Sequence, residues 1–191
     1  MASLNIVLYE PEIPSNTGNI GRTCVATGTR LHLIEPLGFQ LTEKALKRAG
    51  MDYWQDLDVC TYINFDDFLQ KNPGAKIYMA TTKGRRIYTE ISYEENCYLM
   101  FGRESAGIPE ELLAHNHDRC VRIPMMGQTR SLNLANSVTI VLYEALPQNH
   151  FAGMQLTGHL TKFSWVADAT VPASVNISNC GMISETISDA E

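Results

Sequence analysis

Phe101-Gly-Arg-Glu-Ser-Ala-Gly-Ile-Pro109 and, about twenty residues later, Ile123-Pro-Met-Met-Gly-Gln-Thr-Arg-Ser-Leu-Asn-Leu134 share one arrangement. Each segment leaves an apolar run typical of a strand, passes through a glycine-bearing loop with a few polar side chains, and enters a helix. Open α/β sheets bind ligands at such exits from strand to helix. Two such segments in succession, carrying Glu104, Ser131 and Asn133, predict a binding site built from loops.

Apolar runs and turn residues alternate along the rest of the chain. The apolar runs predict strands over 4–9, 30–34, 59–63, 76–80, 97–101 and 120–124. Periodicity and capping residues predict helices over 16–27, 42–50, 66–70, 109–113 and 132–146. Pro11 and Pro14 argue against regular structure between the first strand and the first helix. Since strands and helices alternate, we expect an α/β fold with a mainly parallel sheet and helices on both faces.

Length and composition favour one domain with an appendage. The chain has 191 residues, and its hydrophobic content of 45% is enough for a core. We expect the domain to span residues 1–165. Residues 166–191 hold four acidic residues, no Lys or Arg, and no apolar periodicity, which predicts a poorly ordered acidic tail.

Several classes of protein are disfavoured by composition. No apolar run approaches the roughly 18 to 20 residues that span a bilayer, so we expect no membrane association. The first ten residues lack a basic region and a cleavage-like segment, so a secretory signal is not expected. Five scattered cysteines argue against a disulfide framework and for a reducing, cytoplasmic compartment.

The distribution of charge leaves room for a nucleic-acid partner. The net charge is −6, but removing the four acids of 166–191 leaves 15 basic against 17 acidic residues in 1–165. Basic residues cluster locally in three places: Lys44, Lys47 and Arg48; Lys83, Arg85 and Arg86; and Arg103 with Arg130. These are either ordinary solubilising charges or, taken together, a surface that follows RNA phosphates.

The predicted first helix and the glycine loop each allow two interpretations. Asn16, Asn19 and Arg22 recur every third residue, which makes either a solvated face or a polar surface at a helix start that suits an anion. Gly102 and Gly107 permit backbone conformations or close approaches that side chains would block. Glu104 is then either solvated or a hydrogen-bond acceptor of the site. Ser131 and Asn133 flank the start of the last helix and suit its cap, and capping is compatible with contact to a ligand at the same helix start.

Three other kinds of site find little support. Cys97 and Arg103 have the spacing of a phosphatase loop, but a strand lies between them. His115, His117 and Cys120 lack a second cluster that would complete a zinc site, so we expect no metal. Neither a Gly-x-Gly-x-x-Gly nor a P-loop sequence is present, which disfavours a nicotinamide-dependent oxidoreductase and a nucleotide hydrolase.

Three ordered segments carry a family resemblance: Leu4-Asn-Ile-Val-Leu-Tyr-Glu-Pro-Glu-Ile-Pro-Ser-Asn-Thr-Gly-Asn-Ile-Gly-Arg22, Tyr98-Leu-Met-Phe-Gly-Arg-Glu-Ser-Ala-Gly107, and Ile123-Pro-Met125 with Ser131-Leu-Asn-Leu-Ala-Asn136. Two markers accompany them, Arg30-Leu-His-Leu-Ile-Glu-Pro-Leu-Gly-Phe39 and Arg48-Ala-Gly-Met-Asp-Tyr53. From about Leu4 to about Trp165 the chain resembles the SPOUT methyltransferases. Within them it is similar to the small tRNA 2′-O-methyltransferases that act on cytidine or uridine at the wobble position, 34.

The resemblance implies a fold, a cofactor and partners. The C-terminal part of the domain would be threaded as a deep trefoil knot. Its loops would hold S-adenosyl-L-methionine through Ala80, Gly102, Ile123 and Ser131, largely by their backbone. The family works as a homodimer, with the first and last helices near the interface and tRNA, bound through its anticodon region, spanning both subunits.

The resemblance also implies catalytic residues. Arg22 would bind the attacking ribose oxygen or the adjacent phosphate and stabilise developing negative charge, while Asn16, Glu104 and Asn133 orient it. Gly21 stands where a bulkier residue is common in the family, and Arg103 where proline often does. Two alternatives stay open: ribose methylation at another tRNA or ribosomal RNA position, and an RNA-binding module of this fold without catalysis.

Overall fold

The computed structural model describes residues 4–41, 52–127 and 130–163. The chain divides into two units, residues 1–154 and 155–191. All the described helices and strands lie in the first unit, and the described part of the second, 155–163, contains neither. The predicted helix over 42–50 and the predicted tail over 166–191 lie outside the described residues. None of the described helices has both the length and the apolarity needed to cross a bilayer.

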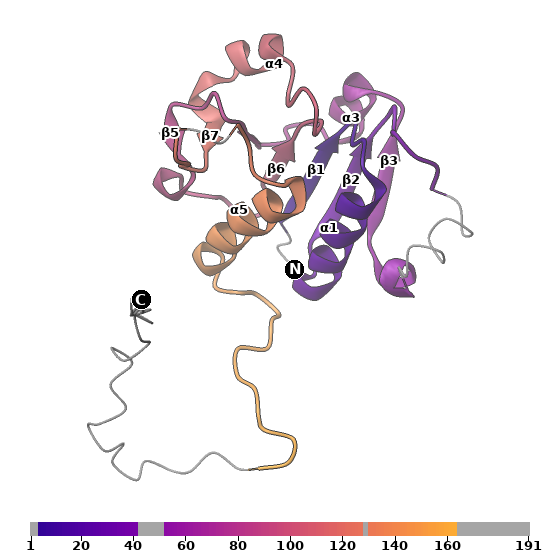
Figure 1. Cartoon of the computed structure of the whole chain (residues 1–191), viewed down its shortest axis with the longest axis vertical. Coiled ribbons are helices and arrows are strands. Elements are labelled where there is room, and N and C mark those ends of the chain that lie inside the picture. The colour runs from indigo at the N-terminus through magenta and orange to yellow at the C-terminus, as the bar shows by residue number, and fades with distance from the viewer. Residues whose placement is uncertain (1–3, 42–51, 128–129, 164–191) are drawn as a thin grey trace, which may run out of the picture. The chain divides into compact units, whose positions relative to one another are not determined.

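Seven strands form one sheet, and every pair of neighbouring strands in it is parallel (Figure 1). The order across the sheet is β3-β2-β1-β6-β4-β7-β5. The strands are β1 (Asn5–Tyr9), β2 (Arg30–Ile34), β3 (Val59–Tyr62), β4 (Ile77–Ala80), β5 (Arg86–Ile87), β6 (Tyr98–Phe101) and β7 (Cys120–Arg122). The predicted parallel sheet is therefore confirmed. β5 was not predicted, because two residues are too few to show an apolar pattern.

The strand order has one unusual consequence for connectivity. β6 lies between β1 and β4, and β7 lies between β4 and β5, although all three flanking strands come earlier in the chain. The chain leaves β1 toward β2 and β3 on one side of the sheet and later fills the other side. The order therefore reverses between β1 and β6, which makes this position a switch point of the kind where open parallel sheets bind ligands.

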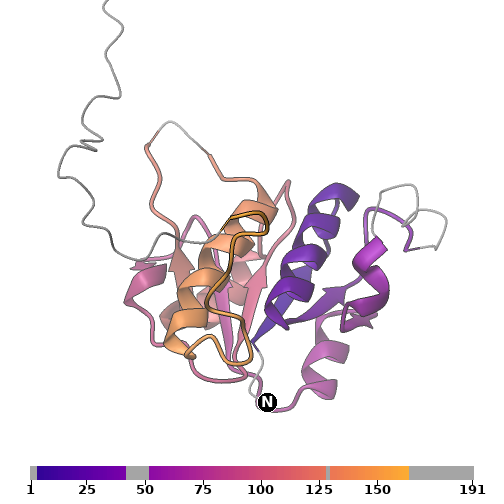
Figure 2. The same ribbon diagram turned by 90° about the horizontal axis from the view of Figure 1, so that it is seen from below.

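Helices cover both faces of the sheet (Figure 1, Figure 2). The helices are α1 (Pro14–Thr27), α3 (Phe65–Lys71), α4 (Glu110–His115) and α5 (Leu134–Gln148), with 3-10 turns η1 (Asp52–Asp56), η2 (Tyr88–Glu90) and η3 (His117–Arg119). Along β1, Ile6 and Leu8 belong to the core packed by α1 and α5, whereas Val7 belongs to the core packed by α3 and α4. This alternation is what a strand buried on both faces requires.

Two helix starts differ from the prediction by two residues. α1 begins at Pro14 rather than at Asn16, because proline lacks only an N–H that the first turn of a helix leaves unused. α5 begins at Leu134, with Asn133 as its N-cap, and runs through Pro147 to Gln148. The predicted stop at Gly28 is confirmed, since this glycine ends α1 with φ of 64°.

A buried polar network ties the first strands together. His32 is 1% exposed, and its Nε2 and Nδ1 lie 3.1 Å from Asn5 Oδ1 and 2.8 Å from the Tyr62 hydroxyl. The Asn5 amide nitrogen donates to the backbone carbonyl of Cys97, so Asn5 Oδ1 is an acceptor for the Nε2–H of His32. Neutral His32 then accepts the Tyr62 hydroxyl proton at Nδ1, and every polar atom of the ring is satisfied.

This network predicts a pH-dependent stability. Burial, and secondly Arg30, lower the pKa of His32 from 6.5 to about 4. The unfolded chain takes up this proton near pH 6.5, so the stability due to neutral His32 is complete above pH 6.5 and is lost as the pH falls toward 4. We expect the free energy of unfolding to be about 2 kcal/mol lower at pH 5 than at pH 7.5. Urea titration of the protein and of His32→Gln measures this; the variant should lose most of the difference, and an equal pH dependence in both would contradict the assignment.

Candidate functional site

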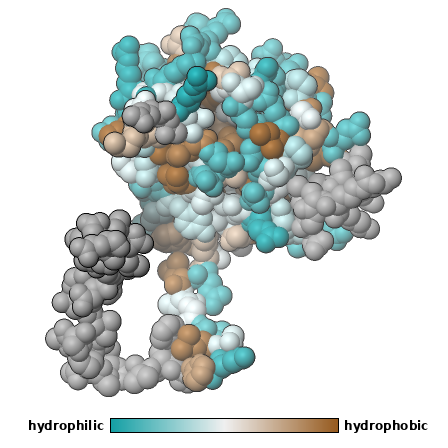
Figure 3. Space-filling model, in the orientation of Figure 1, coloured by the Kyte–Doolittle hydropathy of each residue, from teal (hydrophilic) through white to brown (hydrophobic). Residues whose placement is uncertain are grey.

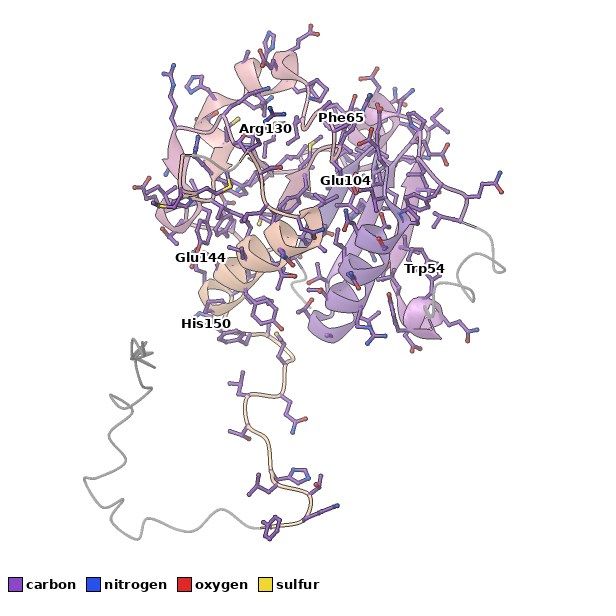
Figure 4. All side chains as sticks on the ribbon, viewed as in Figure 1. Trp54, Phe65, Glu104, Arg130, Glu144 and His150 are labelled. Carbon is purple, nitrogen blue, oxygen red and sulfur yellow. The ribbon has the colours of Figure 1, made fainter. Side chains whose placement is uncertain are left out.

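A cavity of about 520 Å³ lies at the carboxyl ends of β4, β6 and β7. Its walls come from the segments 80–83, 101–108, 123–125 and 130–134, together with Ile13, Asn16 and Ser137. Glu104 and Arg130 lie at this end of the sheet (Figure 4). The structure therefore brings the two sequence segments that predicted a loop-built site into one cavity.

The predicted site residues, with one exception, line this cavity. Those named for the cofactor are Ala80, Gly102, Ile123 and Ser131, and those named for orienting the reaction are Asn16, Glu104 and Asn133. The exception is Arg22, which lies elsewhere on α1.

Gly102 is required by a close approach of the backbone. A Cβ atom at this position would lie 2.0 Å from the carbonyl carbon of Gly107 and 2.2 Å from the nitrogen of Ile108. Gly107 itself adopts φ of 71°, and its N–H donates to the carbonyl of Arg103 at 2.8 Å. The loop thus folds back over the end of β6, and both glycines serve the turn, as their spacing predicted.

A chain of side-chain hydrogen bonds crosses one wall of the cavity; we call Asn133, Asn16 and Glu104 the polar relay. The Asn133 amide donates to Asn16 Oδ1 at 2.9 Å, and the Asn16 amide donates to Glu104 Oε1 at 2.9 Å. Asn133 Oδ1 also accepts from the backbone of Ala135 at 2.9 Å and of Asn136 at 3.3 Å, which caps α5. Asn133 thus caps α5, as predicted, and also lines the cavity.

Glu104 anchors the relay to the entrance of α1. Its carboxylate accepts from the backbone N–H of Glu12 at 2.9 Å and of Ile13 at 3.3 Å. Glu12 returns the contact, accepting from the backbone and hydroxyl of Ser105 at 2.8 and 2.7 Å, and these bonds lower the Glu12 pKa. A carboxylate beside the positive end of a helix is favourable. Glu104 is thus a fixed acceptor rather than a solvated side chain.

Arg22 points away from the relay. It lies six residues after Asn16, which on a helix means about 9 Å along the axis and about 120° around it. Its guanidinium carbon lies 4.9 Å from the centroid of the Tyr53 ring on η1. The even spacing of Asn16, Asn19 and Arg22 therefore does not bring both ends of the row into the same cavity.

An ion pair that sequence reasoning missed joins the residues that follow β1 and β6. Arg103 contacts the carboxylate of Glu10, whose side chain is 12% exposed and whose φ is 50°. Burial, and next a hydrogen bond with Glu10, raise the pKa of neighbouring Tyr9. No local motif signals this pair, because it depends on the adjacency of β1 and β6.

The predicted basic clusters are only partly available for phosphate. Arg103 is paired with Glu10, and Lys83 lies 2.7 Å from Glu110. Arg85 and Arg130 are exposed, and Arg130 lines the cavity. Lys44, Lys47 and Arg48 lie outside the described residues. Within the described part of the chain, no group of three or more His, Cys, Asp or Glu side chains has the arrangement of a metal site.

Comparisons with known proteins give one consistent family. The profile of the SpoU rRNA Methylase family matches residues 3–143. The tRNA (cytidine(34)-2′-O)-methyltransferase of Saccharophagus degradans is 49% identical over 150 residues, 78% of this chain and 97% of that protein. A solved structure described as giving insights into the 2-OH methylation of C/U34 on tRNA is 46% identical with a TM-score of 0.73, covering 78% of this chain and 97% of that chain. An AdoMet-bound rRNA methyltransferase from Sinorhizobium meliloti is 29% identical with a TM-score of 0.66, and the match covers 76% of this chain and 56% of that chain.

The polar relay predicts a cost for removing the negative charge of Glu104. Both carboxylate oxygens of Glu104 accept N–H groups in the wild-type protein. In Glu104→Gln one of these oxygens becomes an NH₂ group, which is a donor and would face another N–H donor. We expect the free energy of unfolding to fall by about 2 kcal/mol, as for hydrogen bonds to a charged group, measured by chemical denaturation at neutral pH. Glu95→Gln, at an exposed position, is the control and should change stability by less than about 0.5 kcal/mol. Unchanged stability in Glu104→Gln would contradict the role of the relay.

Proposed function

The chain belongs to the SpoU rRNA methylase family, and on that premise we propose that it transfers a methyl group from S-adenosyl-L-methionine to the ribose 2′-hydroxyl of nucleotide 34, the wobble cytidine or uridine, of tRNA. One structural observation carries the proposal: the segments named for the cofactor and for the reaction meet in one cavity. The choice of tRNA over ribosomal RNA is supported by the names of the relatives at 46% and 49% identity, against 29% for the rRNA enzyme.

The cavity suits the proposed cofactor. Its volume of about 520 Å³ falls within the range of sites for small molecules. Ala80, Gly102, Ile123 and Ser131 would hold S-adenosyl-L-methionine, with the glycine loop offering backbone edges and Ile123 an apolar wall. When bound, the cofactor supplies a methyl carbon made electrophilic by the adjacent sulfonium. The protein must then align the ribose oxygen and manage its proton.

The reacting ribose would be handled by Arg22 and the polar relay. Arginine keeps its protons in proteins, so Arg22 would bind the attacking oxygen or the neighbouring phosphate and stabilise negative charge as it develops. The relay residues Asn16, Glu104 and Asn133 are held by one another and by backbone N–H groups. They would therefore present a fixed wall against which the nucleotide is oriented.

A second copy of the chain would bring Arg22 to a cavity. In one chain Arg22 lies on the flank of α1 that the cavity does not reach. α1 and α5 pack side by side on one face of the sheet. Ile13, the N-cap of α1, is 43% exposed, and Tyr143 on α5 is 47% exposed. Apolar residues lie among hydrophilic ones on this face (Figure 3). We propose a homodimer through α1 and α5, in which Arg22 of the partner subunit serves this cavity.

The remaining parts of the proposal concern threading, extent and substrate. We propose that the C-terminal part of the domain forms a deep trefoil knot, that the domain extends to residue 165, and that 166–191 form a tail. Support for the knot comes from the late insertion of β7 between β4 and β5 and from the return of α5 to α1. The exposed Arg85 and Arg130 would meet the phosphates of the anticodon region. A tRNA substrate also implies action in the cytoplasm.

The activity itself is tested by methylation of defined tRNA. Purified protein with S-adenosyl-L-methionine should add one ribose methyl at nucleotide 34 of unmodified tRNA, read by nucleoside mass spectrometry. Arg22→Ala should lower kcat by about 100-fold or more, as when one charge-stabilising donor is removed, with unchanged cofactor affinity by calorimetry. Methylation of ribosomal RNA or of another tRNA position would overturn the substrate, and cofactor-independent RNA binding without methylation would indicate a binding module.

Mixed dimers test whether Arg22 acts on the partner's cavity. Ile123→Trp should fill the cavity in one chain, and Arg22→Ala removes the guanidinium from the other; each homodimer should be inactive. Random mixing of the two variants should restore roughly a quarter of the wild-type sites, since half the dimers then hold one complete site. A double variant mixed with either single variant is the control and should stay inactive. An inactive mixture of the two single variants would show that Arg22 acts within its own chain.

A further inference from the structure

The Arg22 guanidinium rests on an aromatic ring rather than on a carboxylate. Its central carbon lies 4.9 Å from the centroid of the Tyr53 ring, within the range of a cation–π contact. Among the described residues, no Asp or Glu forms an ion pair with Arg22. Arg103, by comparison, is neutralised by Glu10. Arg22 is therefore held by an aromatic ring, whereas Arg103 is held by a carboxylate.

Tyr53 is itself held firmly against α1. Its hydroxyl donates to the backbone carbonyl of Gly18 at 2.5 Å. A Cβ atom at Gly21 would lie 3.2 Å from Leu57 Cδ2 and 3.5 Å from Tyr53 Cε2, so these side chains pack directly against α1 at Gly21. Gly18, Gly21 and Arg22 have the i, i+3, i+4 spacing of one helix face. η1, which contacts α1, can be located in Figure 4 by the labelled side chain of Trp54.

The contact leaves the chemistry of the guanidinium available. An ion pair would offset the positive charge of the guanidinium, whereas the neutral Tyr53 leaves that charge in full. A side-chain hydrogen bond with Tyr53 engages Arg22, and a guanidinium has five N–H donors, so further donors remain for a ligand. Burial raises the pKa of Tyr53, so at neutral pH the phenol keeps the proton that it donates to Gly18. The ring therefore restricts a long, flexible side chain while its full charge and outward donors remain usable.

We propose that Tyr53 is the positioning residue of Arg22, fixing the guanidinium on the flank of α1 in the orientation used for methyl transfer. This inference rests on the proposed function of Arg22. It also accounts for Gly21, because the small residue lets the 3-10 turn that carries Tyr53 seat directly on α1. Tyr53 contacts neither the cofactor cavity nor, under this proposal, the substrate.

Substitutions at Tyr53 should change turnover without changing cofactor binding. Tyr53→Leu should lower kcat by about fivefold, as expected for losing a cation–π contact at an exposed site, with KM for S-adenosyl-L-methionine unchanged. Tyr53→Phe keeps the ring but loses the hydroxyl bond to Gly18, so it should lower kcat by clearly less than Tyr53→Leu does. In an Arg22→Ala background, measured by single turnover, Tyr53→Leu should have no further effect. An equal loss in Tyr53→Phe, or a full extra loss without Arg22, would overturn the proposal.

A series of fluorinated phenylalanines at position 53 separates the electronic effect of the ring from any effect on folding. Phenylalanine carrying one, two or three ring fluorines at position 53 keeps its shape while its face becomes less negative. The logarithm of kcat should fall steadily along the series, at constant melting temperature. A flat series would overturn the positioning role, as would a rise in kcat, which would mean that the ring restrains Arg22 in an inactive position. Failure of the proposed function is recognised separately, by wild-type protein that does not methylate tRNA or by Arg22→Ala with full activity.

Discussion

The polar relay is the interaction on which the cavity depends. Asn133 opens α5, Asn16 lies in the first turn of α1, and Glu104 lies on the loop after β6. These three come from distant parts of the chain, and each occupies the hydrogen-bonding groups of the next. The turn at Gly102 determines the position of Glu104, because the backbone of Gly107 and Ile108 returns into contact with Gly102. Backbone geometry and side-chain hydrogen bonds thus define the same wall.

Charge is managed differently on the two sides of α1. On the side of the loops after β1 and β6, Arg103 and Glu10 neutralise each other, and Glu104 accepts N–H groups at the start of α1. On the flank, Arg22 has only an aromatic partner among the described contacts. The side chains of the cavity wall are accordingly hydrogen-bonded to one another, while the positive charge of Arg22 is not neutralised by a described carboxylate. This division is consistent with methyl transfer, in which the protein supplies alignment more than covalent chemistry.

Much of the fold and of the cavity could be predicted from sequence patterns. Strands buried on both faces produce apolar runs, and glycine with polar residues after such runs marks ligand loops, so the segments around Gly102 and Ser131 were predictable. The apolar pattern does not predict β5, because two residues are too few to show a period. The start of α1 differs from the prediction because proline is well accommodated in the first turn of a helix. The Glu10–Arg103 pair and the Tyr53–Arg22 stack were not predictable, since each joins elements that only the tertiary fold makes neighbours.

The order in which strands enter the sheet has a bearing on synthesis at the ribosome. β1, β4 and β5 are all made before the strands that separate and pair them, β6 and β7. A nascent chain that ends before Tyr98 holds edges of β1 and β4 whose native neighbour does not yet exist, and exposed edges recruit wrong partners. The late strands β6 and β7 close these edges, so the sheet has its native edges only once most of the chain has been made.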